Sequence, residues 1–364
     1  MTHEYQMCTR CVMDTTDSAI QFDDNGVCNH CTQFDAKKDL ILLPEKERDA
    51  KLAEFVDGVK EWGTDKQYDC IAGISGGVDS TYMVYKAKQL GLRPLAVHLD
   101  NGWNSRLAVT NIERVLNHLG VDLYTHVINW EEFKDLQNAY FNASVVDIEV
   151  ASDHAITAII HNVAAKRGVE YILLGSNFAT EGIMARSWVW RKNDLRNLLD
   201  IHKKFGSKKL KTYPKLGFLK LVYLKRIKKI KHFPFLNYIH YNRQEAKQLL
   251  IDELGWEDYG GKHHESIFTK FYQSHILPRK FNIDKRKAHL STMICSGQTT
   301  KDEAIKVLEE SLYDEQELKR DTEYVLKKFG WTEEEFEQLM ALPIRPHGEF
   351  KTDRWKRKIL GRLL

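Results

Sequence analysis

The sequence of 364 residues lacks an apolar run long enough to cross a bilayer and lacks an apolar leader near its N-terminus. Its net charge is only +3, from 54 basic and 51 acidic side chains, so bulk charge does not indicate a polyanion binder. With 43% hydrophobic and 29% charged residues, the composition is typical of a globular protein. We therefore expect a cytoplasmic protein of two or three domains without a transmembrane segment.

Cysteine is scarce as well, and six cysteines in a cytoplasmic chain of this length indicate metal or redox chemistry, not a disulfide scaffold. Four of them form two C-x2-C pairs separated by sixteen residues. The four are Cys8, Cys11, Cys28 and Cys31. Four thiolates complete a tetrahedral shell without an open position, so we expect a structural zinc ion, with an iron–sulfur cluster as the competing interpretation. Cys70 and Cys295 stand alone and are expected to be structural.

The most informative segment is SGGVDS at positions 75–80, between an apolar run at 68–74 and a segment to Leu90 that can form a helix. Two adjacent glycines let the backbone approach a ligand, and hydroxyls and helix N-terminal N–H groups can donate to it. The turn has no lysine and is neither GxxxxGK[ST] nor GxGxxG. It is predicted to bind a phosphate or pyrophosphate, and the alternative is an ordinary glycine-rich turn. The expected ligand residues are Ser75, Gly76, Gly77, Asp79 and Ser80.

Strands and helices are predicted to alternate along this part of the chain, which indicates an α/β fold with a doubly wound parallel sheet. Strands are expected at 69–74, 92–99, 122–128 and 171–175, and helices at 46–62, 81–90, 107–119 and 153–167. In such sheets ligands bind at the carboxyl ends of the strands. The turns at 75–80, 100–103 and 175–181 all fall there, so we expect them to form one nucleotide site.

Two further turns supply candidate ligands for that site. Asp100 and Asn101 are expected to contact adenine or ribose, with a simple turn as the alternative. Gly175 and Asn177 open the third turn, and Glu181 is the second candidate after Asp79 for holding magnesium. A divalent cation is expected because a bound pyrophosphate carries a high negative charge.

The predicted domains are a zinc-bound module at 1–45, a nucleotide-binding domain at 46–240 and a mostly helical region at 241–364. Within the second domain, Lys203 to His232 holds eleven lysines and one arginine without an acidic residue. This basic stretch is compatible with nucleic acid, with an anionic membrane surface or with plain solvation. The basic segment 354–358 is expected to extend the same surface.

A second cluster of donors begins at the glycine pair of positions 260 and 261. The candidate catalytic residues there are Lys262, His263 and Lys270, together with Asp79 in the phosphate turn. Adjacent histidines and cations could stabilise charge at phosphorus or bind a sugar diphosphate. The alternative is a surface loop beside helices, which are predicted at 302–311, 314–329 and 332–341, with a capping box formed by Thr300 and Glu303.

The SGGVDS turn resembles the pyrophosphate loop (PP-loop) of the ATP pyrophosphatases, enzymes that split ATP into AMP and pyrophosphate. Four further segments narrow the resemblance: MCTRCVMD at 7–14, CNHC at 28–31, SWVWR at 187–191 and YGGKHHE at 259–265. Together they resemble the N-acetyl sugar amidotransferases of the WbpG and PseA group, over nearly the whole chain. That resemblance implies ATP-dependent conversion of an acetamido group on a nucleotide-linked sugar into an acetamidino group, in surface-polysaccharide or flagellin-glycan synthesis.

The family also implies partners. No glutaminase nucleophile is recognisable in the sequence, so ammonia is expected from a glutaminase and a barrel subunit similar to the two parts of imidazole glycerol phosphate synthase. The alternative function is a tRNA-modifying PP-loop enzyme of the lysidine or thiolation type. Thiolation enzymes generally need further cysteines near the ATP site, and Cys70 and Cys295 are not expected to supply them, so nucleic acid is not the favoured partner.

Overall fold

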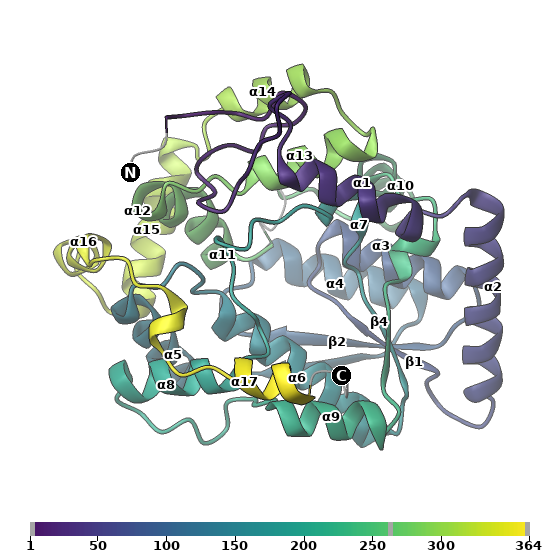
Figure 1. Ribbon diagram of the computed structural model, residues 1–364. Helices are drawn as coiled ribbons and strands as arrows, with labels where there is room; N and C mark the ends of the chain where they lie inside the picture. The colour runs from purple at the N-terminus through teal and green to yellow at the C-terminus, as the bar shows by residue number, and fades with distance from the viewer. Residues whose placement is uncertain (1–3, 261–264, 361–364) are drawn as a thin grey trace.

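A five-stranded parallel sheet forms the centre of the protein in a computed structural model that describes residues 4–260 and 265–360 (Figure 1). The strand order is β3-β2-β1-β4-β5, and every neighbouring pair is parallel. The strands are β1 Cys70–Gly73, β2 Pro94–Asp100, β3 Leu123–Val127, β4 Tyr171–Leu173 and β5 Lys231–Phe233. The predicted α/β fold with a doubly wound sheet is therefore confirmed, with one edge strand, β5, that lies unpredicted inside the basic stretch.

The order of the strands reverses between β1 and β4, because the chain runs outward from β1 to β3 before it returns to the other side of β1. A crevice opens at such a switch point beyond the carboxyl ends of the strands. The phosphate turn follows β1 directly, so the topology alone places it at this crevice.

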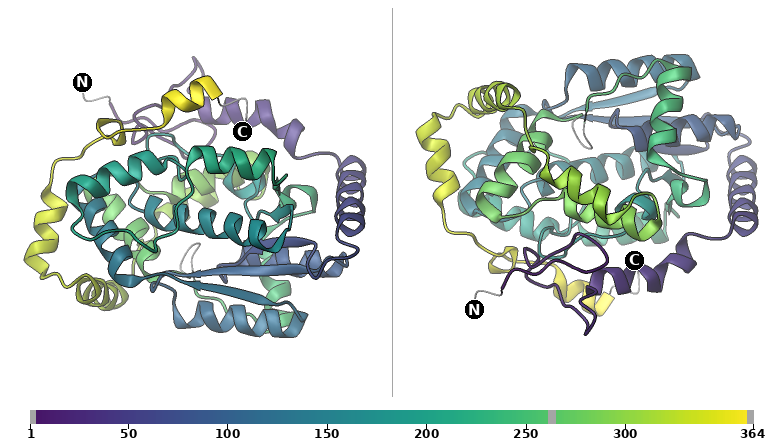
Figure 2. Two further views of the ribbon diagram at one scale, coloured as in Figure 1. Left: turned by 90° about the horizontal axis from the view of Figure 1, so that it is seen from below. Right: turned by 90° about the horizontal axis from the view of Figure 1, so that it is seen from above.

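Helices cover both faces of the sheet (Figure 1 and Figure 2). One layer holds α3 Val78–Gln89, α4 Arg106–Leu119 and α10 Arg243–Leu254. The opposite layer holds α5 Trp130–Ala143, α6 Val150–Arg167, α8 Leu195–Phe205 and α9 Phe218–Arg226. At the β5 edge, α2 Glu45–Trp62 stacks Phe55 on Phe233 with ring centroids 3.4 Å apart. Helix α4 shows why the sequence folds this way: Ala108, Ile112 and Val115 recur at helical spacing and are buried.

The C-terminal region is helical, as predicted. Residues 265–296 pack against the segments that follow β2 and β4, whereas the last helix of the chain lies beside α8 and α9. The helices of this region are α11 Ile267–Phe271, a π-helical turn Tyr272–Ile276, α12 Leu277–Phe281, α13 Arg286–Ser296, α14 Lys301–Glu309, α15 Glu315–Phe329, α16 Glu333–Ala341 and α17 Arg354–Leu360. Helix α13 contacts the short α7 Phe178–Glu181, which follows β4, and also α1 Asn29–Ile41. The predicted capping box of Thr300 and Glu303 is present at the start of α14. Short 3-10 turns occur at Phe235–Tyr238 and His347–Glu349.

Three local expectations need correction or remain open. The helix expected from residue 153 begins at Val150, and α5 lies where no helix was predicted, between the third strand and that helix. The N-terminal segment shares one buried core with the C-terminal helices, since Met13 and Phe34 join the same cluster as Ala288. The boundaries of the three predicted domains stay a prediction. Within the described residues, no helix is long and apolar enough to cross a membrane.

Candidate nucleotide site and metal centre

The phosphate turn is held in shape by its own hydroxyls. Helix α3 begins at Val78, so Asp79 and Ser80 lie in its first turn, where N–H groups remain available to an anion. The Ser80 Oγ accepts a hydrogen bond from the Ser75 backbone N–H at 3.2 Å and lies 3.2 Å from the Ser75 Oγ. The Gly77 N–H donates to the Ser75 Oγ, also at 3.2 Å. Bonds within the protein therefore hold the turn in shape, which lowers the cost of ordering it when a ligand binds.

The two glycines are required for different reasons. Gly76 has a φ of +86°, and a Cβ there would lie 2.7 Å from the carbonyl oxygen of Ala108 in α4. Its own carbonyl accepts a hydrogen bond from the Trp256 Nε1 at 3.0 Å. Gly77 has an ordinary φ of −72°, but a Cβ there would lie 3.2 Å from the Tyr259 hydroxyl. The backbone conformation thus selects glycine at the first position, and a close neighbour selects it at the second.

We expect Gly76→Ala to lower the free energy of unfolding by about 1–3 kcal/mol and to reduce ATP turnover strongly, because the added Cβ meets the backbone of α4 and displaces the turn. The matched control is Gly58→Ala in the middle of α2, where a Cβ meets nothing within 4 Å. That change should stabilise the protein by about 0.5–1 kcal/mol. Urea unfolding and AMP formation measured on both variants test the pair, and an active, stable Gly76→Ala variant would contradict it.

Two carboxylates meet beside this turn at Tyr241. The Tyr241 hydroxyl donates a hydrogen bond to Asp79. Burial and the charge of Asp79 raise the pKa of Tyr241 far above its usual value, and the charge of Glu181 acts in the same direction. The structure thus brings the two predicted magnesium ligands into one neighbourhood, although they are about a hundred residues apart in the chain. Their roles stay a prediction.

In the turn at 100–103, the predicted ligands Asp100 and Asn101 accept hydrogen bonds from the backbone of the turn itself. The Gly102 N–H donates to the Asp100 carboxylate at 2.9 Å, and the Trp103 N–H donates to the Asn101 side-chain oxygen at 3.1 Å. Lys328 of α15 packs over the Trp103 ring, 4.6 Å from its centroid, and donates to the carbonyl of Gly102. These bonds fit the simple-turn interpretation, and contact with adenine or ribose stays a prediction.

The turn at 175–181 lies against the phosphate turn at 75–80. A Cβ on Gly175 would lie 3.3 Å from the Cα of Ser80, so the missing side chain lets the end of β4 approach the first turn of α3. Asn177 caps α7 through its Oδ1, which accepts from the Thr180 N–H at 2.8 Å. Its Nδ2 is buried and has no hydrogen-bond partner within residues 4–260 and 265–360. A buried, unpaired donor beside the phosphate turn is suited to a ligand.

Tyr259 and Glu265, the described ends of the segment 259–265, lie beside the phosphate turn. The Ser105 N–H donates to the carbonyl of Glu265 at 2.8 Å, and the Ile267 N–H donates to the carbonyl of Trp103 at 2.9 Å. This short antiparallel pairing places Tyr259 and Glu265 beside Gly77. The candidate catalytic residues Lys262 and His263 lie outside the described residues. Sequence patterns had not singled out Tyr241 or Trp256, which contact the turn from more than 160 residues away.

A cavity of about 340 Å3 lies between α7, the start of α10 and the C-terminal helices. Its polar wall carries a histidine and four cationic side chains: Arg243, Lys270, Lys285, Arg286 and His289. Lys270 pairs with Glu317 at 2.7 Å and Asp321 at 3.8 Å, so its predicted catalytic role would require it to leave these partners. Its apolar wall includes Leu290, Met293 and Leu312.

Arg243 lies on the wall of this cavity, two residues after Tyr241 in the chain. The Tyr241 hydroxyl bonds Asp79 of the phosphate turn, and the charge of Arg243 lowers the pKa of Tyr241. The Arg243 Nε is buried and has no hydrogen-bond partner in the part of the chain that the structure describes. A buried guanidinium with an unused donor is a natural ligand for phosphate. The sequence did not indicate Arg243 as a ligand, because it is the first residue of a helix without any recognisable motif.

The four predicted metal ligands form a second centre, above the sheet, where the N-terminal segment meets α13 and α14 (Figure 1). All four sulfurs are buried and lie within 4.8 Å of one another. Three of the sulfur–sulfur distances are 3.7, 3.8 and 3.9 Å. A tetrahedral ion with bonds of about 2.3 Å separates its sulfurs by about 3.8 Å. The Cys28 N–H donates to the Cys8 Sγ at 3.2 Å, which favours a thiolate. The donor set therefore fits a single metal ion.

Cys70 and Cys295 were both expected to stand alone, and this expectation is wrong for Cys295. Cys70 is isolated in β1, where burial raises the pKa of its thiol well above the usual value, as befits an inert structural residue. Cys295 is not isolated: its Sγ lies 3.7 Å from the Sγ of Cys31. It belongs to α13, the helix that also carries His289 and Met293 of the cavity. One rigid helix thus connects the metal centre to the cavity wall.

The parallel sheet with its switch point and the SGGVDS turn at the carboxyl end of β1 form an arrangement suited to holding a phosphate group. Residues 265–360 match the family model described as "LPS biosynthesis protein WbpG-like, C-terminal domain". The expected resemblance to the WbpG group is therefore confirmed for the C-terminal part of the chain.

Solved structures similar to this chain are distant. An NH3-dependent NAD synthetase from Campylobacter jejuni is 15% identical, with 46% of this chain and 80% of that chain covered and a TM-score of 0.30. An NMN synthetase from Francisella tularensis is 14% identical, with 64% and 95% covered and a TM-score of 0.31. The U34-tRNA thiolase NcsA from Methanococcus maripaludis, solved with its [4Fe-4S] cluster, is 15% identical, with 84% and 89% covered and a TM-score of 0.35. No curated protein matches the chain significantly.

Proposed function

We propose that the protein is an ATP-dependent, AMP-forming amidotransferase that converts an acetamido group of a nucleotide-linked sugar into an acetamidino group. The observation that carries this proposal is one arrangement: a short segment joins Tyr241, which contacts the phosphate turn, to Arg243, which lines the cavity, and the other cavity cations belong to the part that matches the WbpG-like domain. One anionic substrate can then lie on the turn while a second lies in the cavity. The product would serve surface-polysaccharide or flagellin-glycan synthesis in the cytoplasm.

The reaction has to turn an amide oxygen into a leaving group. The acetamido oxygen attacks the α-phosphorus of ATP, a P–O bond forms, and the bond to pyrophosphate breaks. Ammonia then attacks the imidate carbon and loses protons, and AMP leaves with the former amide oxygen. Ser75, Ser80 and the N–H groups at the start of α3 would hold the departing pyrophosphate. Most of the rate would come from positioning the two substrates and from stabilising negative charge at phosphorus.

Two metals accompany this proposal. Magnesium would be held by Asp79 and Glu181, where it would neutralise the pyrophosphate. Zinc is proposed for the cysteine centre, because four sulfurs within 4.8 Å of one another surround one ion and leave no room for a cluster of four irons. Ammonia would come from a separate glutaminase and a barrel subunit.

The cavity would bind the nucleotide-sugar acceptor. Its volume of about 340 Å3 falls in the range of ligand pockets, at the small end. Arg243 and Lys285 could pair with a diphosphate, while Leu290 and Met293 could cover the sugar or the base. A tRNA-modifying enzyme is the second candidate, and the exposed basic stretch is the observation that favours it.

The test is turnover with ATP, magnesium and ammonium, offered either UDP-linked diacetamido sugars or bulk tRNA, with products followed by mass spectrometry. We expect AMP to form only with a sugar, and nitrogen to replace oxygen in that sugar. AMP formed only with tRNA would favour the second candidate, and ADP with either acceptor would exclude AMP-forming chemistry altogether.

We further expect Arg243→Gln and Lys285→Gln to raise the acceptor KM by about tenfold or more, because each removes a charge-assisted hydrogen bond to phosphate. Lys306→Gln is the matched control: this lysine is exposed on α14, does not line the cavity, and should leave the KM unchanged. Steady-state kinetics with varied sugar nucleotide at saturating ATP measure the effect. Wild-type KM values in both cavity variants would place the acceptor elsewhere.

A further inference from the structure

The basic stretch 203–232 does not contribute to the nucleotide site, and part of it carries exposed apolar side chains. Helix α9 buries Phe218, Leu221 and Leu224, which satisfies its contact with the core. A second apolar stripe on the same helix recurs at four-residue spacing and is exposed; it consists of Leu219, Tyr223 and the adjoining Ile227. A nine-residue helix that is apolar on two sides has one side without a partner inside the described protein.

Two neighbouring helices continue this surface. Helix α17 exposes Trp355 and Ile359, again four residues apart, and α8 exposes Leu199. We call these six side chains and the cations around them the basic apolar face; its apolar members are between 39% and 69% exposed. Figure 1 shows α8, α9 and α17 together below the sheet, on the side opposite to α13 and α14. The face is therefore remote from the metal centre.

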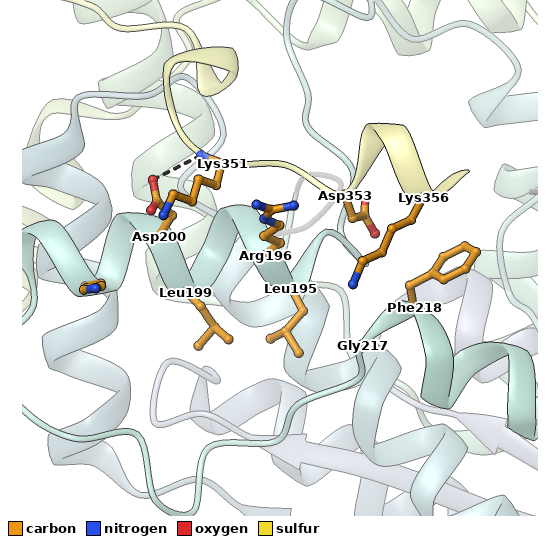
Figure 3. Close-up of a pocket in the computed structure, with 10 residues that line it drawn as sticks. Leu195, Arg196, Leu199, Asp200, Gly217, Phe218, Lys351, Asp353 and Lys356 are labelled. Carbon is orange, nitrogen blue, oxygen red and sulfur yellow. Dashed lines mark hydrogen bonds between the residues drawn. The ribbon is translucent and has the colours of Figure 1, made fainter. Parts of the chain in front are cut away.

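A cavity of about 360 Å3 joins the three helices (Figure 3). Arg196 and Lys203 of α8 line it, and Lys356 of α17 reaches toward Phe218 at the start of α9 (Figure 3). Its two carboxylates are already paired, since Asp200 bonds Lys204 at 3.1 Å and Asp353 pairs with Arg191. The cavity is consequently cationic.

Basic side chains predominate on this face. Between Lys203 and His232 there are twelve lysine and arginine side chains and no acidic one. The exposed members of that stretch are Lys203, Lys204, Lys208, Lys209, Lys211, Lys220, Arg226, Lys228, Lys229 and Lys231. Two of them are paired with acids from outside the stretch, Lys204 with Asp200 and Lys208 with Glu131. Helix α17 adds the exposed Arg354 and Lys358. An anionic partner therefore fits this face best.

The apolar members decide which anionic partner fits. Only Tyr223 and Trp355 among the six apolar side chains are aromatic, and they lie on different helices. The other four are aliphatic and offer no ring for a base to stack on, whereas nucleic-acid grooves combine cations with rows of aromatic platforms. Apolar side chains and a tryptophan surrounded by lysines are the pattern of helices that lie in the interface of an anionic bilayer. We infer that the basic apolar face docks the protein on an anionic lipid surface, with the stripe of α9 and Trp355 inserted between headgroups.

Co-sedimentation of the full chain with vesicles tests this inference. The vesicles are phosphatidylcholine alone or an equal mixture with phosphatidylglycerol, at about 0.15 M salt. We expect binding to the mixed vesicles only. Leu219→Gln combined with Ile227→Gln should weaken that binding about tenfold by removing inserted apolar area. Lys228→Gln combined with Lys229→Gln should weaken it by a similar factor.

The matched control is Leu40→Gln, because Leu40 is 77% exposed on α1, away from this face, and should bind like the wild type. Sugar-dependent AMP formation should be unchanged in all of these variants, which separates the surface from the proposed reaction. Equal binding to both kinds of vesicle, binding to tRNA but not to vesicles, or wild-type binding by the Leu219/Ile227 variant would overturn the inference.

Discussion

Replacing Asp79 by asparagine is expected to reduce AMP formation by about 10³-fold, which corresponds to roughly 4 kcal/mol of transition-state stabilisation. Asp79 lies in the first turn of α3, inside the segment that would hold pyrophosphate. A carboxylate so close to pyrophosphate is repelled unless a divalent cation lies between them. Asparagine keeps the shape and can still accept the hydrogen bond from Tyr241, but it cannot supply the charge that binds the cation.

The matched control is Asp302→Asn, which removes an exposed first-turn carboxylate from α14. Its activity should remain within about twofold of the wild type, because a first-turn acid contributes at most about 1 kcal/mol to stability. Quenched-flow or steady-state AMP assays at several magnesium concentrations measure both variants, and circular dichroism checks that each is folded. An Asp79→Asn variant with more than about a tenth of wild-type activity would remove Asp79 from the proposed mechanism.

Cys28→Ser should release the metal ion and lower the melting temperature by about 6 °C, a loss of roughly 5 kcal/mol. The ion would hold together four buried sulfurs where the N-terminal segment meets α13 and α14. Protein contacts at the same place include the hydrogen bond from the Val12 N–H to the Ser291 Oγ at 3.2 Å and that from Lys301 to the carbonyl of Cys8 at 2.7 Å. Without the ion, α13 loses the surface against which Cys295 packs, so the cavity wall should loosen as well.

Two other cysteines give matched controls. Cys70→Ala and Cys295→Ala each remove a buried thiol outside the group of four and should keep one metal ion per chain. Elemental analysis and absorption spectra of the purified variants measure metal content and type. A brown protein with several irons per chain would overturn the proposal of zinc, and loss of the ion from Cys295→Ala would make Cys295 a fifth ligand.

Local patterns in the sequence were sufficient for the phosphate turn and the metal ligands. A glycine pair between an apolar run and a helix can fold in few ways, and two C-x2-C pairs each bring both sulfurs to one turn. The strands β1, β2 and β4 were likewise readable as short, largely apolar runs, and β3, with the sequence LYTHV, as a short run of strand-forming residues. Strand β5 was not readable, because it is only three residues long and begins with lysine and histidine.

The sequence by itself determined the α/β class, the turn that faces a phosphate and the four clustered thiols, because each depends on residues close together in the chain. Only the tertiary structure decided which distant side chains complete these sites. Tyr241 meets Asp79 across 162 positions, and Cys295 meets Cys31 across 264. The packing also decided which apolar stripe of α9 is buried and which is exposed. Burial is set by the neighbours that a folded chain brings together, and no local pattern records them.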